Sequence, residues 1–544
     1  MTNLSIAQAA TLRPISEIAE VAGIDAADYE PLGRSKAKLS TTGVERFRTR
    51  SSNGKLVLVT AITPTPSGEG KTTVTVGLSQ GLRRIGKTAI PAIREPALGP
   101  VLGNKGGACG GGYSQVLPME DINLFFTGDF PAISAAHNLL SAILDARLHH
   151  GNDLHFDPRF PTWPRTMDMN DRALREIVVG LGGTANGYAR EDGFVVTPAS
   201  EVMAILCLSR TLQELKERLG RCLVGVTIKR EPVFARDLNA HHAMTALLRD
   251  AIRPNLVQTI EGGPALVHGG PFANIAHGCS TIIGTECGLG LAEYTITEAG
   301  FASDLGAEKF LNIVCPLLGR GPNAIVLVAT IRALKHHGGG DLEVGFANLQ
   351  RHIRHLTQYG PPVVVAINRF VDDTPEETEL VRAWCEREGV RAVPSDPWNS
   401  GGPGCEELAA AVAEAASRPS TFESLYNDAM TFEDRLQTVV TRVYGGAGFE
   451  LSETARKRLE WTEKHGFGKL PICMAKTPAS FSDDPSRFGA PEGFTIHIRE
   501  LRTSIGAGFI VPVSGEILLM PGLGKAPAAF QIDVDAAGRI TGLF

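Results

Sequence analysis

The sequence lacks paired cysteines of the kind that bind zinc or form a disulfide framework. Its nine cysteines include no CxxC pair, and their number is odd. Scattered cysteines of this kind are typical of proteins in a reducing compartment, so we expect a cytoplasmic protein. The histidines also lack a metal-ligand spacing such as HExxH. Neither a zinc site nor a disulfide framework is therefore expected.

Long apolar runs and clusters of basic residues are absent as well. No apolar stretch approaches the roughly 20 residues that a membrane-spanning helix needs, and no signal-peptide-like apolar segment opens the chain. The net charge is −6 and the pI about 6.2, and the lysines and arginines are spread along the chain. We therefore expect neither a membrane nor a nucleic acid as a partner.

What the sequence does contain is a series of short, continuously apolar runs, the pattern of strands that are buried on both faces of a sheet. They lie at Leu56–Ile62, Asn323–Thr330 and Pro361–Asn368, and a further strand ends at Arg94. The first of these runs is followed by a loop, an amphipathic helix and the strand that ends at Arg94. The right-handed crossover of such a unit leaves its two strands parallel. The pattern predicts an α/β fold with a mainly parallel sheet.

The length of the chain predicts more than one domain. At 544 residues it exceeds the size at which a single hydrophobic core stops growing. The segment between the two groups of strands has helices and a strand of its own, and the end of the chain turns to short strands punctuated by Gly and Pro. The predicted units are a P-loop nucleotide-binding domain at 1–120 and 254–418, an inserted α/β domain at 121–253, and a C-terminal α+β domain at 419–544.

The loop after the first strand, TPSGEGKT, matches most of the phosphate-binding consensus GxxxxGK[ST]. Thr65 takes the place of the first glycine, but successive backbone N–H groups and a helix N-terminus still suit an anion. Lys71 would reach the β- and γ-phosphates, and the Thr72 hydroxyl would ligate Mg²⁺. A glycine-rich turn with a solvent-facing lysine is the alternative, and the strand before the loop and the helix after it disfavour it. The predicted nucleotide-binding residues are Thr65, Pro66, Ser67, Gly68, Glu69, Gly70, Lys71 and Thr72.

Residues that follow the other strands are further candidates, because ligands of parallel sheets bind at the carboxyl ends of the strands. Arg94 could hold a carboxylate or a phosphoryl group through two hydrogen bonds, or it could be a surface residue paired with Glu95. Phe370 and Trp398 could stack on a planar heterocycle, although an aromatic residue after a strand more often packs into the core.

Two other groups of residues favour a structural role. The run Asn104–Tyr113 carries Lys105 among five glycines; it could form an anion nest, but a flexible surface loop is the more common outcome. We interpret His268, His277 and the adjacent pair 336–337 as loop or core histidines. None of these groups is included in the predicted site.

Seven long segments carry a family resemblance. In chain order they are TPTPSGEGKTT, REPALGPVLGNKGGACGGGYSQVLPMEDINLFFTGD, DMNDRALR, EGGPALVHGGPFANIAHGC, TEAGFASDLGAEKF, VATIRALKHHGG and MPGLGKAPAAFQIDVDAAGRITGLF. Together they resemble formate–tetrahydrofolate ligases (formyltetrahydrofolate synthetases), in the expected order and spacing from about Lys38 to Phe544. The length is similar to that of the short, single-function bacterial form.

The resemblance implies a reaction and roles for the candidate residues. ATP, formate and tetrahydrofolate would give ADP, phosphate and 10-formyltetrahydrofolate by way of formyl phosphate. By this likeness ATP would bind at Thr65–Thr72, Lys71 and Arg94 would be catalytic, and Arg94 would hold formate and then formyl phosphate. Phe370 and Trp398 would sandwich the pterin and the neighbouring ring of the folate. The family also implies a homotetramer and activation by a monovalent cation, K⁺ or NH₄⁺.

Three positions depart from the family pattern. Asn104 stands where an aliphatic residue is usual, and Cys109 replaces a usual alanine. Both are small changes near glycine-rich backbone that would tune the loop without removing its function. Phe125 stands where the family more often has histidine, which puts a proton-transfer role for that position in doubt.

Two other functions compete with this interpretation. Another carboxylate-activating P-loop ligase, similar to dethiobiotin synthetase, would share the loop and an acyl phosphate but would not need Phe370 and Trp398 as a stacking pair. A partitioning or scaffold ATPase would use the nucleotide as a switch. Such proteins are usually much shorter and carry a membrane- or DNA-binding tail, which is not evident in this sequence.

Overall fold

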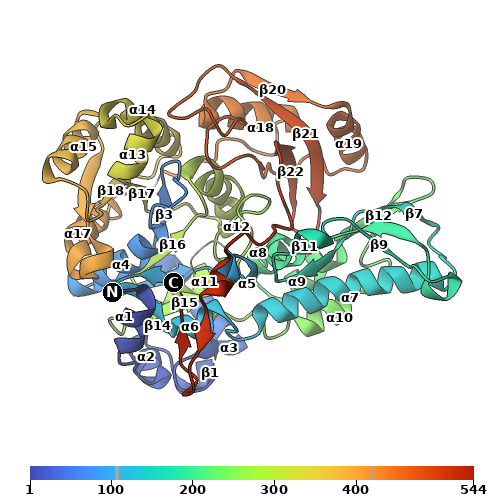
Figure 1. Cartoon of the computed structure of the whole chain (residues 1–544), viewed down its shortest axis with the longest axis horizontal. Coiled ribbons are helices and arrows are strands. Elements are labelled where there is room, and N and C mark those ends of the chain that lie inside the picture. The colour runs from blue at the N-terminus through green and yellow to red at the C-terminus, as the bar shows by residue number, and fades with distance from the viewer. Residues whose placement is uncertain (104–108, 420, 544) are drawn as a thin grey trace.

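The computed structural model describes residues 1–103, 109–419 and 421–543. Its centre is one large sheet with helices packed on both sides (Figure 1). In spatial order its main path is β1 (Tyr29–Pro31), β2 (Ala37–Leu39), β14 (Asn255–Thr259), β15 (Pro264–Val267), β4 (Ala89–Ile93), β16 (Tyr294–Glu298), β3 (Lys55–Ala61), β17 (Ala324–Ala329), β18 (Val363–Asn368) and β19 (Arg391–Ser395).

Most of this sheet is parallel, as predicted. Every neighbouring pair from β15 to β19 along the path runs parallel, while β1, β2 and β14 pair antiparallel at the opposite edge. Strands β3 and β4 are parallel to each other, but β16 lies between them. The α/β class is confirmed.

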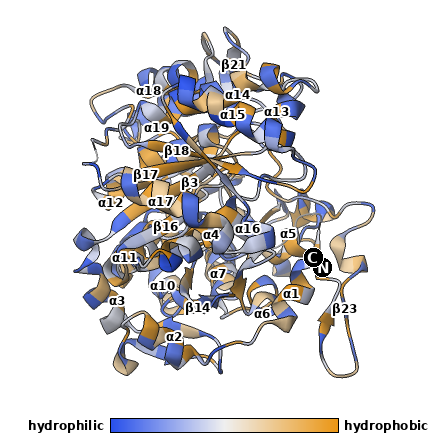
Figure 2. Cartoon of the chain, turned by 90° about the vertical axis from the view of Figure 1, so that its left-hand side faces the viewer, coloured by the Kyte–Doolittle hydropathy of each residue, from blue (hydrophilic) through white to orange (hydrophobic). Residues whose placement is uncertain are grey.

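Helices cover the sheet because their apolar residues share one face. In α14 (Leu342–Thr357) the side chains of Leu342, Phe346, Leu349, Ile353 and Leu356 are all buried. A capping box at Thr374 opens α15 (Pro375–Arg387). Figure 2 shows the apolar strands β3, β17 and β18 next to these more polar helices. The other covering helices are α3 (Thr41–Arg48), α4 (Lys71–Arg84), α11 (Ile282–Leu291), α13 (Ile331–His337) and α17 (Glu406–Ala415).

The segment that precedes β14 forms small sheets of its own. The strand expected in this segment is β12 (Leu223–Thr227), which lies between β7 (Phe156–Pro161) and β13 (Pro232–Phe234). Beside it runs the long helix α7 (Asp129–His149) (Figure 1). The remaining elements here are α6 (Met119–Asn123), β8 (Arg165–Met167), β9 (Ile177–Val179), β10 (Arg190–Asp192), β11 (Phe194–Val196), α8 (Glu201–Leu208), α9 (Leu212–Gly220) and α10 (His241–Leu247).

The last part of the chain begins with helix and continues with strands. Helices α18 (Phe432–Thr438) and α19 (Glu453–Lys464) accompany a sheet of β20 (Gly448–Leu451), β21 (Thr495–Ser504) and β22 (Phe509–Ser514). The chain then returns through β23 (Asp533–Val534) and β24 (Ile540–Thr541) to α1 (Asn3–Ala9), where Gln8 Nε2 donates to the Ile540 carbonyl at 2.8 Å. The two ends of the chain accordingly lie near each other in Figures 1 and 2.

The division into three domains and their bounds stay a prediction. Within the described residues, no helix is long and apolar enough to cross a membrane.

Candidate functional site

The glycines of the loop Thr65–Thr72 are required by its backbone. Gly68 and Gly70 both have φ of +74°, a left-handed conformation that other residues adopt at a cost. Gly70 directly precedes α4, so the loop feeds straight into the N-terminus of a 14-residue helix. A helix N-terminus carries unpaired N–H groups and a partial positive charge, which suit a phosphate.

Glu69 fixes the two ends of this loop to the sheet. It is 1% exposed, and its Oε1 accepts the Thr65 N–H at 2.6 Å and the Thr65 hydroxyl at 2.8 Å. Its other carboxylate oxygen accepts the hydroxyl of Thr330, the residue after β17. Asn368, the last residue of β18, donates from Nδ2 to the Glu69 carbonyl at 3.0 Å. The carboxylate of Glu69 thus holds the loop in place.

Thr72 faces a carboxylate that the sequence did not point to. Its hydroxyl lies 3.0 and 2.9 Å from the two carboxylate oxygens of Glu298, which ends β16 and is 2% exposed. Hydroxyl and carboxylate oxygens are the donors that Mg²⁺ prefers, and the ion usually takes its other ligands from phosphates and water. The described part of the chain holds no cluster of three or more His, Cys, Asp or Glu that could bind a metal on its own. The donor set fits an Mg²⁺ that arrives with a nucleotide.

Arg94 follows β4 and retains hydrogen-bonding capacity. Its Nη1 donates to the Pro271 carbonyl at 3.4 Å, while its Nε is buried and has no hydrogen-bond partner among the described residues. Within the same residues it forms no ion pair with a carboxylate, so the alternative of a surface pair with Glu95 is not what the structure shows. Glu95 is itself buried, and burial together with the nearby Asp129 raises the pKa of its carboxyl group. Arg94 is available to hold an anion.

His277 lies near Arg94, although the sequence suggested only a loop or core role for it. Its side chain is fully buried, and neither ring nitrogen has a hydrogen-bond partner among the described residues. Burial, with the nearby charges of Arg94 and Lys309, lowers its pKa to about 3, so the ring is neutral at pH 7. By contrast, His268 bonds at 2.7 Å to both the Thr281 hydroxyl and the Ala251 carbonyl, as a core histidine does.

The two candidate stacking residues are only partly covered. Phe370 is 36% exposed, and the guanidinium carbon of Arg332 lies 4.3 Å from its ring centroid. Trp398 is 38% exposed and lies in α16 (Pro397–Ser400), just after β19, where its Nε1 donates to Asn3 Oδ1 at 3.0 Å. Neither ring is packed in the core, so both can offer a face to a ligand. Within the described residues no ring–ring contact joins Phe370 and Trp398, and their pairing stays a prediction.

The family departures fall in three different settings. Asn104, like Lys105, lies outside the described residues. Cys109 is buried and accepts a hydrogen bond from Asn123 Nδ2 at 3.4 Å, and burial raises the pKa of its thiol. Phe125 is 73% exposed and lines a cavity of about 120 Å³ that also has Glu95 on its wall.

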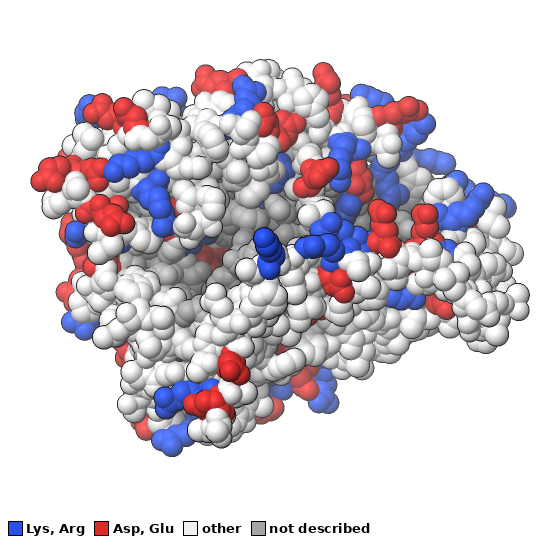
Figure 3. Space-filling view, in the orientation of Figure 1, with Lys and Arg blue, Asp and Glu red and all other residues white. Residues whose placement is uncertain are grey.

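The strand-end residues therefore gather on one edge of the parallel sheet. The loop Thr65–Thr72 contacts the ends of β16, β17 and β18 through Glu298, Thr330 and Asn368. Arg94 follows β4, which pairs with the other side of β16. The face shown in Figure 3 is hollowed near its centre, and Lys and Arg side chains gather to one side of the hollow.

Sequence reasoning missed Glu298 and the surroundings of His277. Glu298 is the last residue of the run Tyr294–Glu298. Threonines alternate with other residues in this run, so it lacks the continuous apolar pattern that predicts a buried strand. A signal was present, since Thr297 and Glu298 are the first two residues of the segment TEAGFASDLGAEKF that resembles the family. His277 carried no such signal, because its empty hydrogen-bonding positions appear only once the loop is folded against Arg94.

Such a sheet, with a glycine-rich loop and polar residues at the ends of its strands, is typical of α/β enzymes that bind small molecules at the carboxyl ends of their strands. A family model described as formate–tetrahydrofolate ligase matches residues 1–544. The chain belongs to this family.

Curated relatives agree over the full length. Proteins named formate–tetrahydrofolate ligase from Methylococcus capsulatus and Symbiobacterium thermophilum are 53% and 54% identical to the chain, with 100% of both sequences covered in each case. A protein of the same name from Paracoccus denitrificans is 53% identical, again with full coverage of both.

Proposed function

We propose that the chain ligates formate to tetrahydrofolate with ATP, giving 10-formyltetrahydrofolate, ADP and phosphate through formyl phosphate. The observation that carries the overall reaction is the family match over the whole chain. The geometry of the strand ends supports the assignment of residues to steps. We further propose a cytoplasmic homotetramer activated by a monovalent cation, as the resemblance implies.

The chemistry explains why two charged substrates need one preorganised site. Formate is a poor electrophile because its charge is spread over two oxygens. In the first step a formate oxygen attacks the γ-phosphorus of ATP, the bond to the bridging oxygen of ADP breaks, and ADP leaves. In the second step the N10 amine of the folate attacks the formyl carbon and loses a proton. The bond between that carbon and the bridging oxygen breaks, and phosphate departs with the oxygen.

The first step depends on positioning and charge neutralisation. In the proposal, backbone N–H groups where the loop enters the N-terminus of α4, together with the Lys71 ammonium, hold the β- and γ-phosphates. Arg94 directs two N–H groups at formate, for which its unpartnered Nε is suited. Thr72 and Glu298 would hold the Mg²⁺ that accompanies ATP, and this ion would supply positive charge beside the phosphates.

The second step needs the folate ring held in a fixed plane. In the proposal, Phe370 and Trp398 each offer one ring face to the pterin and the neighbouring ring. The Arg332 guanidinium already lies against Phe370, which supports that ring from one side. This leaves the exposed part of Phe370 for the folate.

A coupled assay tests the function as a whole. ATP turnover is measured with ATP alone, with formate or tetrahydrofolate omitted, and with all three present. We expect appreciable ADP formation only in the complete mixture. Rapid hydrolysis of ATP with neither co-substrate would contradict the proposal and favour the switch ATPase, while turnover with a different carboxylate and no folate would favour the dethiobiotin-synthetase-like alternative.

A further inference from the structure

Thr63 lies where the chain leaves β3 for the phosphate loop, two residues before Thr65, and side chains hold all of its polar groups. Its N–H donates to His352 Nε2 at 2.8 Å. Its hydroxyl oxygen accepts from Asn348 Nδ2 at 3.0 Å, and its carbonyl accepts from His337 Nε2 at 3.0 Å. Thr63 is 1% exposed, so water does not replace these partners. The backbone at the start of the loop is therefore fixed by α13 and α14.

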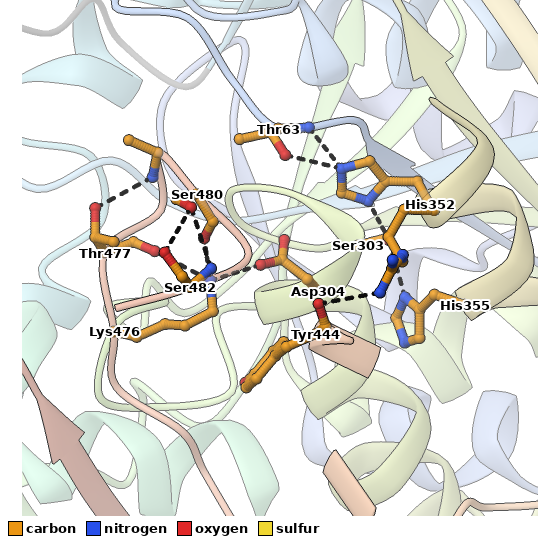
Figure 4. A network of polar contacts seen from close by, with 12 residues as sticks. Thr63, Ser303, Asp304, His352, His355, Tyr444, Lys476, Thr477, Ser480 and Ser482 are labelled. Carbon is orange, nitrogen blue, oxygen red and sulfur yellow. Dashed lines mark hydrogen bonds and ion pairs between the residues drawn. The ribbon is translucent and has the colours of Figure 1, made fainter. Parts of the chain in front are cut away.

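The bond to His352 specifies one form of its ring. A backbone N–H can only donate, so Nε2 must be the unprotonated nitrogen and the ring hydrogen must be on Nδ1. Nδ1 then donates to Ser303 Oγ at 2.7 Å, and the Ser303 hydroxyl donates to His355 Nδ1 at 2.9 Å (Figure 4). Burial, followed by the charges of His337 and Lys476, lowers the pKa of His352 well below its usual value. The ring stays neutral at pH 7 and keeps its acceptor for Thr63.

The same buried network reaches the C-terminal part of the chain. Lys476 Nζ and Asp304 Oδ2, 2.8 Å apart, form an ion pair that is almost wholly buried, one residue from Ser303 (Figure 4). Asn348 Nδ2 donates to the Gly489 carbonyl at 2.7 Å as well as to Thr63. The ring centroids of Phe481 and His352 lie 4.6 Å apart. Residues 476–489 thus close over the side chains that hold Thr63.

The loop Thr65–Thr72 itself is anchored independently of this network. Glu69 and Asn368 hold it from the ends of β17 and β18, with no contribution from His352. Loss of the His352 bond would therefore loosen the backbone at Thr63, from which the loop starts, while Glu69 still holds Thr65. A defect confined to the use of ATP is the expected consequence, because the amides that follow Thr63 would no longer point in one fixed direction.

We propose that His352 is a positioning residue for the phosphate loop, and that its neutral ring sets the path of Thr65–Thr72 by holding the backbone of Thr63. This rests on the proposed function, in which the loop binds ATP. His352 acts through Thr63 and does not itself touch a substrate. His355 belongs to the same network but makes no bond to Thr63, so it provides a matched control.

The experiment compares His352→Phe, His352→Gln and His355→Phe in the full chain, with KM for each substrate, kcat and thermal unfolding measured. We expect His352→Phe to raise the KM for ATP at least fivefold and to leave the KM for tetrahydrofolate within twofold. His352→Gln should restore most of the ATP affinity, since its amide oxygen can accept the Thr63 N–H. His355→Phe should lower the unfolding temperature but keep the wild-type KM for ATP.

Two results would overturn the inference. One is an equal change in the KM for ATP in His352→Phe and His355→Phe; the other is a His352→Phe variant that loses only thermal stability. If His352→Phe does not fold, His352→Asn and His352→Gln replace it, because the shorter Asn side chain does not reach the Thr63 amide. A KM for ATP that is raised in His352→Asn but not in His352→Gln supports the inference, and equal KM values in the two variants contradict it.

Lys71→Ala separates this inference from the proposed function. A Lys71→Ala variant that uses ATP normally would contradict the role of the loop itself. An impaired Lys71→Ala variant beside a normal His352→Phe variant would contradict only the positioning role.

Discussion

The phosphate loop and the two aromatic residues differ in how firmly the protein holds them. Glu69 in the loop and Thr63 at its entry are each 1% exposed, and distant side chains bond to them: those of Thr330, His337, Asn348, His352 and Asn368. Phe370 and Trp398 are 36% and 38% exposed, and each has few polar anchors. A fixed loop suits phosphoryl transfer, in which positioning supplies most of the catalysis. Open rings suit a large planar ligand that completes the packing itself.

The largest expected effect is on the phosphate loop, in Lys71→Ala. Removing one preorganised cationic donor should lower turnover by about 100-fold or more, or roughly 3 kcal/mol of transition-state stabilisation. Steady-state kinetics with saturating substrates measures it. Lys457→Ala, on the exposed face of α19, is the control and should keep normal turnover. Near-normal turnover in Lys71→Ala would remove the loop from the mechanism.

The buried histidines next to the phosphate loop should also make the stability of the protein sensitive to acid. Burial lowers the pKa of His355 to about 3, whereas in the unfolded chain it is about 6.5. Between these two pKa values His355 is protonated in the unfolded chain but not in the folded chain. The contribution of the neutral ring to the unfolding free energy is therefore complete above pH 6.5 and is lost as the pH falls below it. His355 alone should cost about 2 kcal/mol of unfolding free energy at pH 5.

His355→Gln tests this by removing the titrating group. Chemical denaturation at pH 7 and pH 5 should show a smaller loss of unfolding free energy in the variant than in the wild type, by about 2 kcal/mol. His336→Gln, at an exposed neighbouring histidine, should retain the wild-type pH dependence. Equal losses in His355→Gln and the wild type would show that His355 is not held neutral by burial.

The smallest expected effect is on the partly exposed aromatic residues, in Trp398→Ala. Loss of one stacking face should raise the KM for tetrahydrofolate about tenfold, or ~1.4 kcal/mol, with the KM for ATP unchanged. Trp398→Phe keeps a ring and should show a smaller change. An altered KM for ATP without a change for tetrahydrofolate would overturn the stacking assignment.

Some features of the fold and of the candidate site could be predicted from the sequence because they depend on local patterns. Continuous apolar runs predicted β3, β17 and β18 because their side chains are buried on both faces. The motif TPSGEGKT predicted a glycine-rich turn, and Gly68 and Gly70 there do have positive φ. These are local properties, and they survive as patterns in the sequence.

What the sequence could not predict depends on contacts between distant segments. Strand β16 alternates threonine with apolar residues, so its burial between β3 and β4 and the approach of Glu298 to Thr72 were not visible. The bond from Thr63 to His352 joins residues 289 positions apart. Histidines such as His277 look alike in a sequence, and only folding decides which keep unfilled hydrogen-bonding positions.

The central claim is that the loop Thr65–Thr72 serves to phosphorylate formate. The direct measurement uses formate labelled with oxygen-18 in the complete reaction and follows the isotope in the products by mass spectrometry. Because the oxygen that attacks the γ-phosphorus leaves with the phosphate, we predict one labelled oxygen in each phosphate formed. Phosphate without label, alongside normal formation of 10-formyltetrahydrofolate, would contradict the account.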